Sequence, residues 1–91
     1  MTQTSQDEFT EVLRREGYQN VVVVEREPNA ALDLHSHPFA SRALILAGEI
    51  ELIVGGRSNT YRPGEVFVLQ NGEMHAERYG AAGVRYLVGR K

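Results

Sequence analysis

Residues 31–37 of the chain are Ala31-Leu32-Asp33-Leu34-His35-Ser36-His37, a segment that alternates like a β-strand and carries two of the three histidines. Side chains two residues apart in a strand point to the same face, about 6.5–7 Å apart along it. Two imidazoles placed in this way can converge on one metal ion. A third ligand from another strand would complete the set, and His75 is the only histidine left to supply it.

The sequence after Gly17 is typical of β-structure throughout. Apolar and β-branched runs alternate with turn signals about every eight to ten residues, which predicts about seven or eight short strands and no helical crossover. Four consecutive valines at 21–24 predict a strand that is buried on both faces or lies in a dimer interface. Such a pattern favours a barrel or a sandwich. The expected later strands are 43–54, 66–69, 74–79 and 84–88, the expected turns are 28–29, 55–56, 62–65, 71–72 and 80–83, and the expected core residues are Ile45, Ile50, Leu52, Phe67 and Leu69.

Residues 1–17 are expected to form an N-terminal arm with one short helix at about residues 6–16, and residues 18–91 a β-barrel domain. Ser5-Gln6-Asp7-Glu8 has the pattern of a capping box, in which Ser5 and Glu8 bond each other's backbone amides. Phe9 and Leu13 follow at helical spacing, and Gly17 is placed to end the helix.

Composition limits the classes of function. A chain of 91 residues makes one small domain of marginal stability, which a bound metal or a dimer partner would increase. The net charge of −2 and the scattered basic residues argue against nucleic acid as a direct partner. No apolar run reaches the roughly 20 residues of a membrane span, and the polar, acidic N-terminus is unlike a secretion signal. The sequence therefore predicts a soluble cytoplasmic protein.

The spacing of histidines and glycines resembles that of the cupin superfamily, whose members are small double-stranded β-helix (jelly-roll) barrels. The first cupin motif contains His-x-His, then a glutamate, then a glycine, and His35, His37 and Gly48 match it. The second motif contains two glycines and a histidine, and Gly64, Gly72 and His75 fall at the right offsets. The resemblance covers about residues 18–90 and implies an all-β jelly-roll barrel with one short N-terminal helix.

Three positions depart from the cupin motifs. The position of the usual glutamate ligand holds Ser41, or Arg42 if the spacer is one residue longer, and neither supplies a carboxylate. The proline of the second motif is Gln70 and its asparagine is Tyr79. These departures leave the expected fold unchanged, but they alter the metal site that the resemblance implies.

The expected metal ligands are His35, His37 and His75. Such a set suits Zn, Fe, Ni, Mn or Cu as a divalent ion. Glu77 and Tyr79 share the parity of His75 and are the candidate catalytic residues. Glu77 could be a fourth ligand, an acceptor that fixes an imidazole, or a general base, and Tyr79 could bond a ligand or a metal-bound water.

Two more side chains have alternative roles. Asp33 could orient a neighbouring histidine or be an exposed turn neighbour. Arg42 could turn inward as a bidentate handle for a carboxylate, or could lie in a surface salt bridge.

Three functions follow from this reading. One is a small metal-binding cupin whose compact pocket takes a small polar or carboxylate-bearing molecule; as an enzyme it would be dioxygenase- or lyase-like. Another is a non-catalytic sensor or small-molecule binding module. The third is a structural dimer that uses only the barrel, and the resemblance implies a homodimer in any of these cases.

Overall fold

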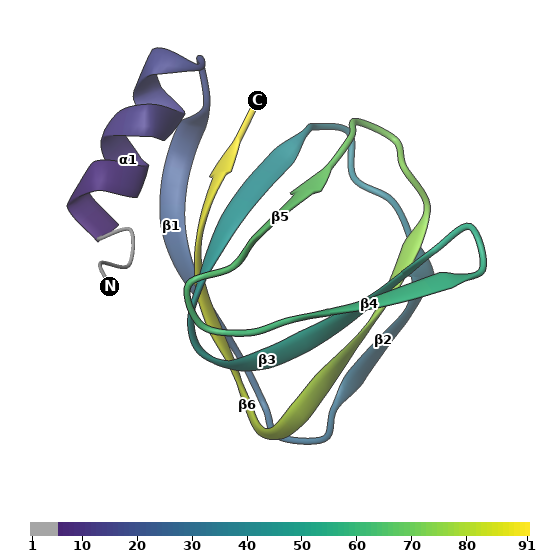
Figure 1. The fold of residues 1–91 in the computed structure, drawn as a ribbon. Helices are drawn as coiled ribbons and strands as arrows, with labels where there is room; N and C mark the ends of the chain where they lie inside the picture. Colours follow the sequence, from purple (N-terminus) through teal and green to yellow (C-terminus); the bar gives the residue numbers. More distant parts are fainter. Residues whose placement is uncertain (1–5) are drawn as a thin grey trace.

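Two long antiparallel strands, β3 (Ser41–Val54) and β6 (His75–Arg90), run through the whole barrel (Figure 1). The structure is a computed structural model that describes residues 6–91. Within these residues there are one helix and six strands. The helix is α1 (Gln6–Arg15), and the four shorter strands are β1 (Gln19–Arg26), β2 (Ala31–His35), β4 (Arg57–Tyr61) and β5 (Val66–Leu69). In this part of the chain no helix has the length and apolar character needed to cross a membrane.

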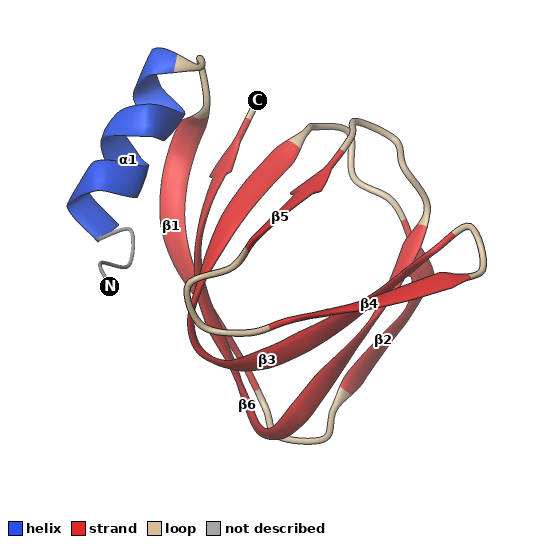
Figure 2. Cartoon of the chain, in the orientation of Figure 1, coloured by secondary structure: helices blue, strands red, loops and turns tan. Residues whose placement is uncertain are grey.

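Each long strand takes part in both layers of the barrel. The first half of β3 pairs with β5 and with the end of β6, and β1 pairs with that same end of β6. The second half of β3 pairs with β4 and with the start of β6, which also pairs with β2. Two layers that share bent strands enclose the interior (Figure 2), so the expected all-β jelly-roll barrel with one short N-terminal helix is confirmed.

β6 continues through Gly80-Ala81-Ala82-Gly83, where the sequence predicts a turn between two strands. That prediction is wrong, and so is the expected number of strands. Gly83 has a left-handed backbone with φ +72°, and Gly48 of β3 has φ +71°. A Cβ on Gly48 would overlap the carbonyl oxygen of Gly83, and a Cβ on Gly83 would overlap that of Arg26. Glycine therefore lets three backbones pass very closely, and the strand bends instead of ending.

The core lies between the two layers. It contains the five expected residues, Ile45, Ile50, Leu52, Phe67 and Leu69, together with Ala43, Tyr79, Val84, Tyr86 and Val88. Alternating side chains of the strands supply these residues, as expected for a sheet with one buried face. Those five predictions of burial are confirmed.

A second cluster joins the helix to the outside of the barrel. Phe9 and Leu13 of α1 pack against Leu44 and Leu87 of the sheet. The helix ends at Arg15, close to the expected residue 16, and the amide of Tyr18 donates to the carbonyl of Leu13 at 2.9 Å. With Gly17 at φ +85°, this is a Schellman C-cap. The predicted capping box depends on Ser5, which lies outside the described residues.

The four-valine segment forms part of β1, which pairs only with β6 among the described strands. Val22 and Val23 are 40% and 50% exposed, so burial on both faces is wrong for the single chain. An edge strand has one neighbouring strand only, and the side chains that pack against helix α1 do not include Val23. A homodimer through this strand stays a prediction, and sedimentation velocity would test it.

Candidate metal centre

The three histidines meet where the start of β6 lies beside the end of β2. His35 is the last residue of β2 and pairs directly with His75, the first residue of β6. His37 lies beyond the strand, in the loop before β3, so the expectation that both histidines belong to one regular strand is wrong. The amide of Gly72 donates to the carbonyl of His37 at 2.8 Å and holds this loop against the loop that precedes β6.

The geometry brings four donor side chains together. The ring centres of His35 and His75 are 4.3 Å apart, and that of His37 lies 4.9 Å from the first and 5.4 Å from the second. One ligand atom from each histidine and one carboxylate oxygen of Glu77 all lie within 4.8 Å of one another. His75 and Glu77 are buried, at 1% and 6% exposure. Such a cluster could hold a metal ion.

Backbone carbonyls orient two of the imidazoles. Nδ1 of His35 donates to the carbonyl of Asp33 at 2.6 Å, and Nδ1 of His75 donates to the carbonyl of Glu73 at 2.9 Å. Because a carbonyl can only accept, each Nδ1 carries a hydrogen, and Nε2 is the nitrogen of each ring that faces the cluster. Asp33 thus orients His35, which is one of the two roles predicted for it. It does so through its backbone carbonyl and not through its side-chain carboxylate, which is exposed.

At the centre of the cluster two imidazole nitrogens approach one carboxylate oxygen. Nε2 of His35 and Nε2 of His75 each lie 3.2 Å from the same oxygen, Oε2 of Glu77. Nε2 of His35 is buried and has no hydrogen-bond partner. A buried nitrogen and carboxylate oxygen at this distance are satisfied by a proton or by a cation between them. Imidazole and carboxylate donors are those of transition-metal sites, so the residues present fit such an ion.

Glu77 and Tyr79 form a buried pair behind the histidines. The hydroxyl of Tyr79 donates to Oε1 of Glu77 at 3.0 Å, which leaves Oε2 for the two imidazoles. Burial, with the charge of Glu77, raises the pKa of Tyr79 well above its ordinary value. Tyr79 therefore keeps its proton at neutral pH and acts here as a donor that orients the carboxylate.

Burial lowers the pKa of His37, and the neighbouring His35 and His75 lower it further. A lowered pKa favours the neutral imidazole, which is the form that can bind a metal. The ring of Phe39 stacks on His37, with 5.0 Å between ring centres and 14° between planes.

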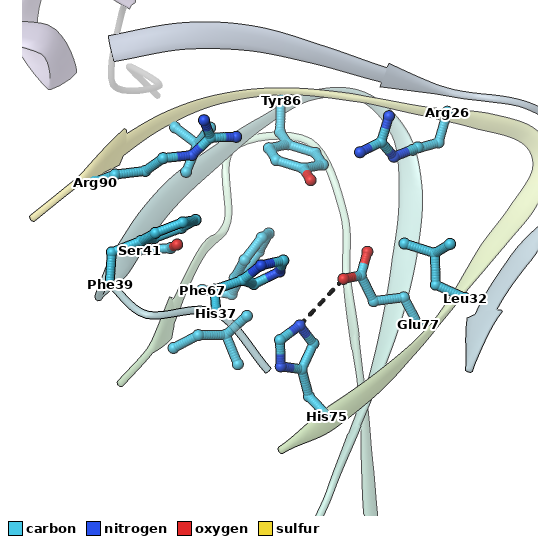
Figure 3. A pocket seen from close by; sticks show the side chains of 12 residues that line it. Arg26, Leu32, His37, Phe39, Ser41, Phe67, His75, Glu77, Tyr86 and Arg90 are labelled. Atoms are coloured by element: carbon cyan, nitrogen blue, oxygen red, sulfur yellow. Dashed lines mark hydrogen bonds and ion pairs between the residues drawn. The ribbon is translucent and has the colours of Figure 1, made fainter. Parts of the chain in front are cut away.

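A cavity of about 80 Å³ opens beside the cluster (Figure 3). His37, His75 and Glu77 lie at one side of it, and Arg26, Tyr86 and Arg90 at the other. Its remaining lining is mostly apolar and comprises Leu32, Phe39, Ser41, Phe67, Leu69 and Val88. Burial raises the pKa of Tyr86 to about 12, so its hydroxyl keeps its proton at neutral pH.

The two candidates for the missing glutamate position lie in different places. Ser41 is buried and lines the cavity. Arg42 forms an ion pair with Glu16, just beyond the end of α1. The prediction that Arg42 turns inward to bind a carboxylate ligand is wrong, and the alternative, a surface salt bridge, is confirmed. The carboxylate of Glu16 lies on the outer side of β3 and pairs with Arg42.

Arg26, Tyr86 and Arg90 line the cavity but are absent from the residues expected from the sequence. Alternation along β6 makes residues 75, 77 and 79 inward-facing, whereas beyond the bend residues 84, 86, 88 and 90 are inward-facing. The bend at 80–83 therefore changes the parity. Counting alternate residues forward from Val84 would have found Tyr86 and Arg90.

Comparison with solved structures places the fold among known barrels. The cupin domain of Schizosaccharomyces pombe Cnp3 aligns with a TM-score of 0.72 and 22% identity over 82% of this chain and 56% of its own. The DMSP lyase DddQ from Ruegeria pomeroyi aligns with a TM-score of 0.68 and 28% identity, over 76% of this chain and 36% of its own.

A third neighbour is the polyketide cyclase RemF from Streptomyces resistomycificus, with a TM-score of 0.64 and 25% identity over 85% of this chain and 58% of its own. The chain thus spans less than two thirds of the length of each of these three structures. No curated protein sequence matches it significantly.

A comparison of the sequence with protein-family models agrees with this structural similarity. The model described as the cupin domain matches residues 22–87, which includes all three histidines and reaches from β1 into the last part of β6. The match covers well over half of the 91 residues, and the two-layered barrel agrees with it. The chain belongs to the cupin family.

Proposed function

We propose that this cupin binds one divalent transition metal through His35, His37, His75 and Glu77, and acts on a small polar or carboxylate-bearing molecule held in the adjacent cavity. The observation that carries the proposal is the convergence of four donor side chains, whose ligand atoms lie within 4.8 Å of one another, with Nε2 of His35 buried and without a hydrogen-bond partner. A divalent cation at this point would satisfy all of them at once.

Glu77 then supplies the carboxylate that Ser41 and Arg42 lack. In this role Glu77 lies two residues after His75 on the same strand face, where Tyr79 holds its second oxygen. Three imidazoles and one carboxylate suit Zn, Fe, Ni, Mn or Cu, and the supply of each metal in the cell decides among them.

We further propose that the bound molecule is transformed. A metal in this position would supply Lewis acidity to a ligand oxygen. Two of the similar structures, at 28% and 25% identity, are named as a lyase and a cyclase, which favours an enzymatic role over a sensor. The residues of this chain orient the ligand against the histidines, and the apolar walls of the cavity exclude bulk water from it.

Metal content tests the proposal. Untagged protein, purified without chelators and measured by inductively coupled plasma mass spectrometry, should contain about one transition metal per chain. His75→Ala should lose it, since that imidazole is fully buried among the donors. Glu77→Gln should bind metal at least about tenfold more weakly, because a neutral amide replaces an anionic ligand. Glu27→Gln, an exposed change of the same charge, is the matched control and should keep the metal.

A His75→Ala protein that retains its full metal content would overturn this assignment. Turnover is tested separately with metal-loaded protein, with and without oxygen. A ligand that raises the melting temperature but yields no product would favour the sensor.

A further inference from the structure

We propose that Arg90, assisted by Arg26, makes the cavity selective for a small carboxylate anion. The inference rests on the proposed function in one respect, since it names the class of ligand for the same cavity. It depends on the two arginines and on the shape of the site, and not on which metal the histidines hold.

Both guanidinium groups face the cavity across from the donor cluster. Arg26 is the last residue of β1 and Arg90 the last of β6, and Figure 3 shows them on either side of Tyr86, facing His37 and Glu77. A molecule that bridges the cavity would therefore have the histidines at one end and an arginine at the other.

Neither arginine has a carboxylate partner. Over residues 6–91, the arginines that form ion pairs within 4.0 Å are Arg15, Arg42 and Arg62. Arg26 makes only a long bond, 3.4 Å, to the carbonyl of its neighbour Glu25. Arg90 lies over the ring of Phe39, with its guanidinium carbon 5.2 Å from the ring centre. A cation–π contact does not consume the N–H donors of a guanidinium, which can still bind an anion.

Phe39 links Arg90 to the donor cluster. Its ring stacks on His37 at 5.0 Å and carries Arg90 at 5.2 Å. Arg90 is therefore held beside a proposed metal ligand by a rigid aromatic ring. Arg26 has no such support and is exposed, so Arg90 is expected to dominate recognition.

The charges of the lining favour an anion. Arg26 and Arg90 face a single anionic side chain, Glu77, and a divalent cation would add further positive charge. Positive charge that is partly removed from water attracts an anion more strongly than at the surface. A planar guanidinium binds a carboxylate through two parallel hydrogen bonds.

The size and the lining of the cavity limit the kind of anion that it can bind. At about 80 Å³ it is far smaller than the roughly 300–1,000 Å³ of pockets that take drug-sized ligands. Phe67, Leu69 and Val88 also line it and suit a short carbon chain better than a fully hydrated inorganic ion. Monocarboxylates of about two to four carbons fit both conditions.

Matched pairs of probes test the inference. Isothermal titration calorimetry of zinc-loaded and metal-free protein would compare lactate with lactamide and propionate with propionamide, with inorganic phosphate as a further anion. The carboxylates should bind at least about tenfold more tightly than their amides, as expected for a charge-assisted bidentate contact. In Arg90→Gln that preference should fall below about threefold. Arg78→Gln, which makes the same charge change on the outer face of β6, should keep it.

Arg90→Lys is a second variant, which keeps the inference testable if Arg90→Gln does not fold. It keeps the charge but loses the planar fork, so its preference should lie between those of wild type and Arg90→Gln. Equal binding of amides and carboxylates by wild type, an unchanged preference in the Arg90→Gln Arg26→Gln double variant, or tighter binding of phosphate than of any carboxylate would each overturn the inference.

An error in the proposed metal site would give a different result. The wild-type protein would then contain no metal, or His75→Ala would retain it, independently of how the carboxylates and amides bind. The carboxylate preference of metal-free protein still decides the role of Arg90.

Discussion

Glu77 is the residue at which the candidate metal centre differs from the cupin motifs. Both of its oxygens are engaged, Oε1 by the hydroxyl of Tyr79 and Oε2 by its approach to His35 and His75. The cupin motif places its carboxylate elsewhere, at the position that Ser41 or Arg42 holds here. A carboxylate two residues after His75 joins the three histidines, because alternate residues of a strand share a face.

Tyr79→Phe should weaken metal binding by about tenfold and leave the fold intact. The hydroxyl touches only the carboxylate, and loss of such an outer contact lowers metal affinity by about 10–100-fold. Competition with a fluorescent chelator measures the affinity. Tyr61→Phe removes a hydroxyl from β4, which lies on the other side of β3 from β6, and should leave the metal affinity unchanged. An unaltered affinity in Tyr79→Phe would show that Glu77 is not a ligand held by this bond.

Among the strands and the helix, the bend of β3 and β6 matters most for the site. Gly48 and Gly83 both have positive φ, and their backbones pass too closely for a side chain. The bend returns the end of β6 over the cavity and places Tyr86 and Arg90 opposite the histidines (Figure 3). Without it the two halves of the strand could not contribute to one site.

Gly48→Ala should lower the free energy of unfolding by more than about 2 kcal/mol. The left-handed conformation alone costs about 1–2 kcal/mol, and overlap with Gly83 adds to it. Gly56→Ala is the control, since Gly56 also has positive φ, +80°, but open space around it. Urea denaturation compares the two. Equal losses in both variants would contradict the close crossing.

The whole molecule is small for the site that it builds. A chain of 91 residues buries only about two thirds of its unfolded surface, so a metal bound at the proposed centre would add a large share of its stability. A ligand at 100 times its dissociation constant contributes about 2.7 kcal/mol. In a domain of this size each kcal/mol changes the melting temperature by about 4–8 °C.

Removal of the metal should therefore lower the melting temperature by about 10 °C or more. Differential scanning calorimetry of protein with excess zinc, and of protein treated with EDTA and dialysed, measures the change. His75→Ala should melt at the same temperature in both conditions, because it lacks the buried ligand. Identical melting of wild type in both conditions would favour a barrel that does not use a metal.

Tertiary structure alone decided several features of the molecule. Arg42 bonds Glu16, 26 residues earlier in the chain, and no local pattern reveals that partner. The exposure of Val22 and Val23 depends on which strands lie beside β1. The parity of β6 changes at a bend whose glycines also fit a turn, so alternation counted from His75 cannot be carried past it.

The sequence by itself determined the class of fold, the positions of most turns, the extent of β5, the five expected core residues and the three histidines that meet in space. Each of these depends on turn residues, alternation or motif spacing, which act between neighbours in the chain. The arginines of the cavity, the orientation of Glu77 by Tyr79 and the continuity of β6 depend on contacts between distant segments. Those contacts exist only after the two layers have closed over the interior, and therefore only the folded chain could reveal them.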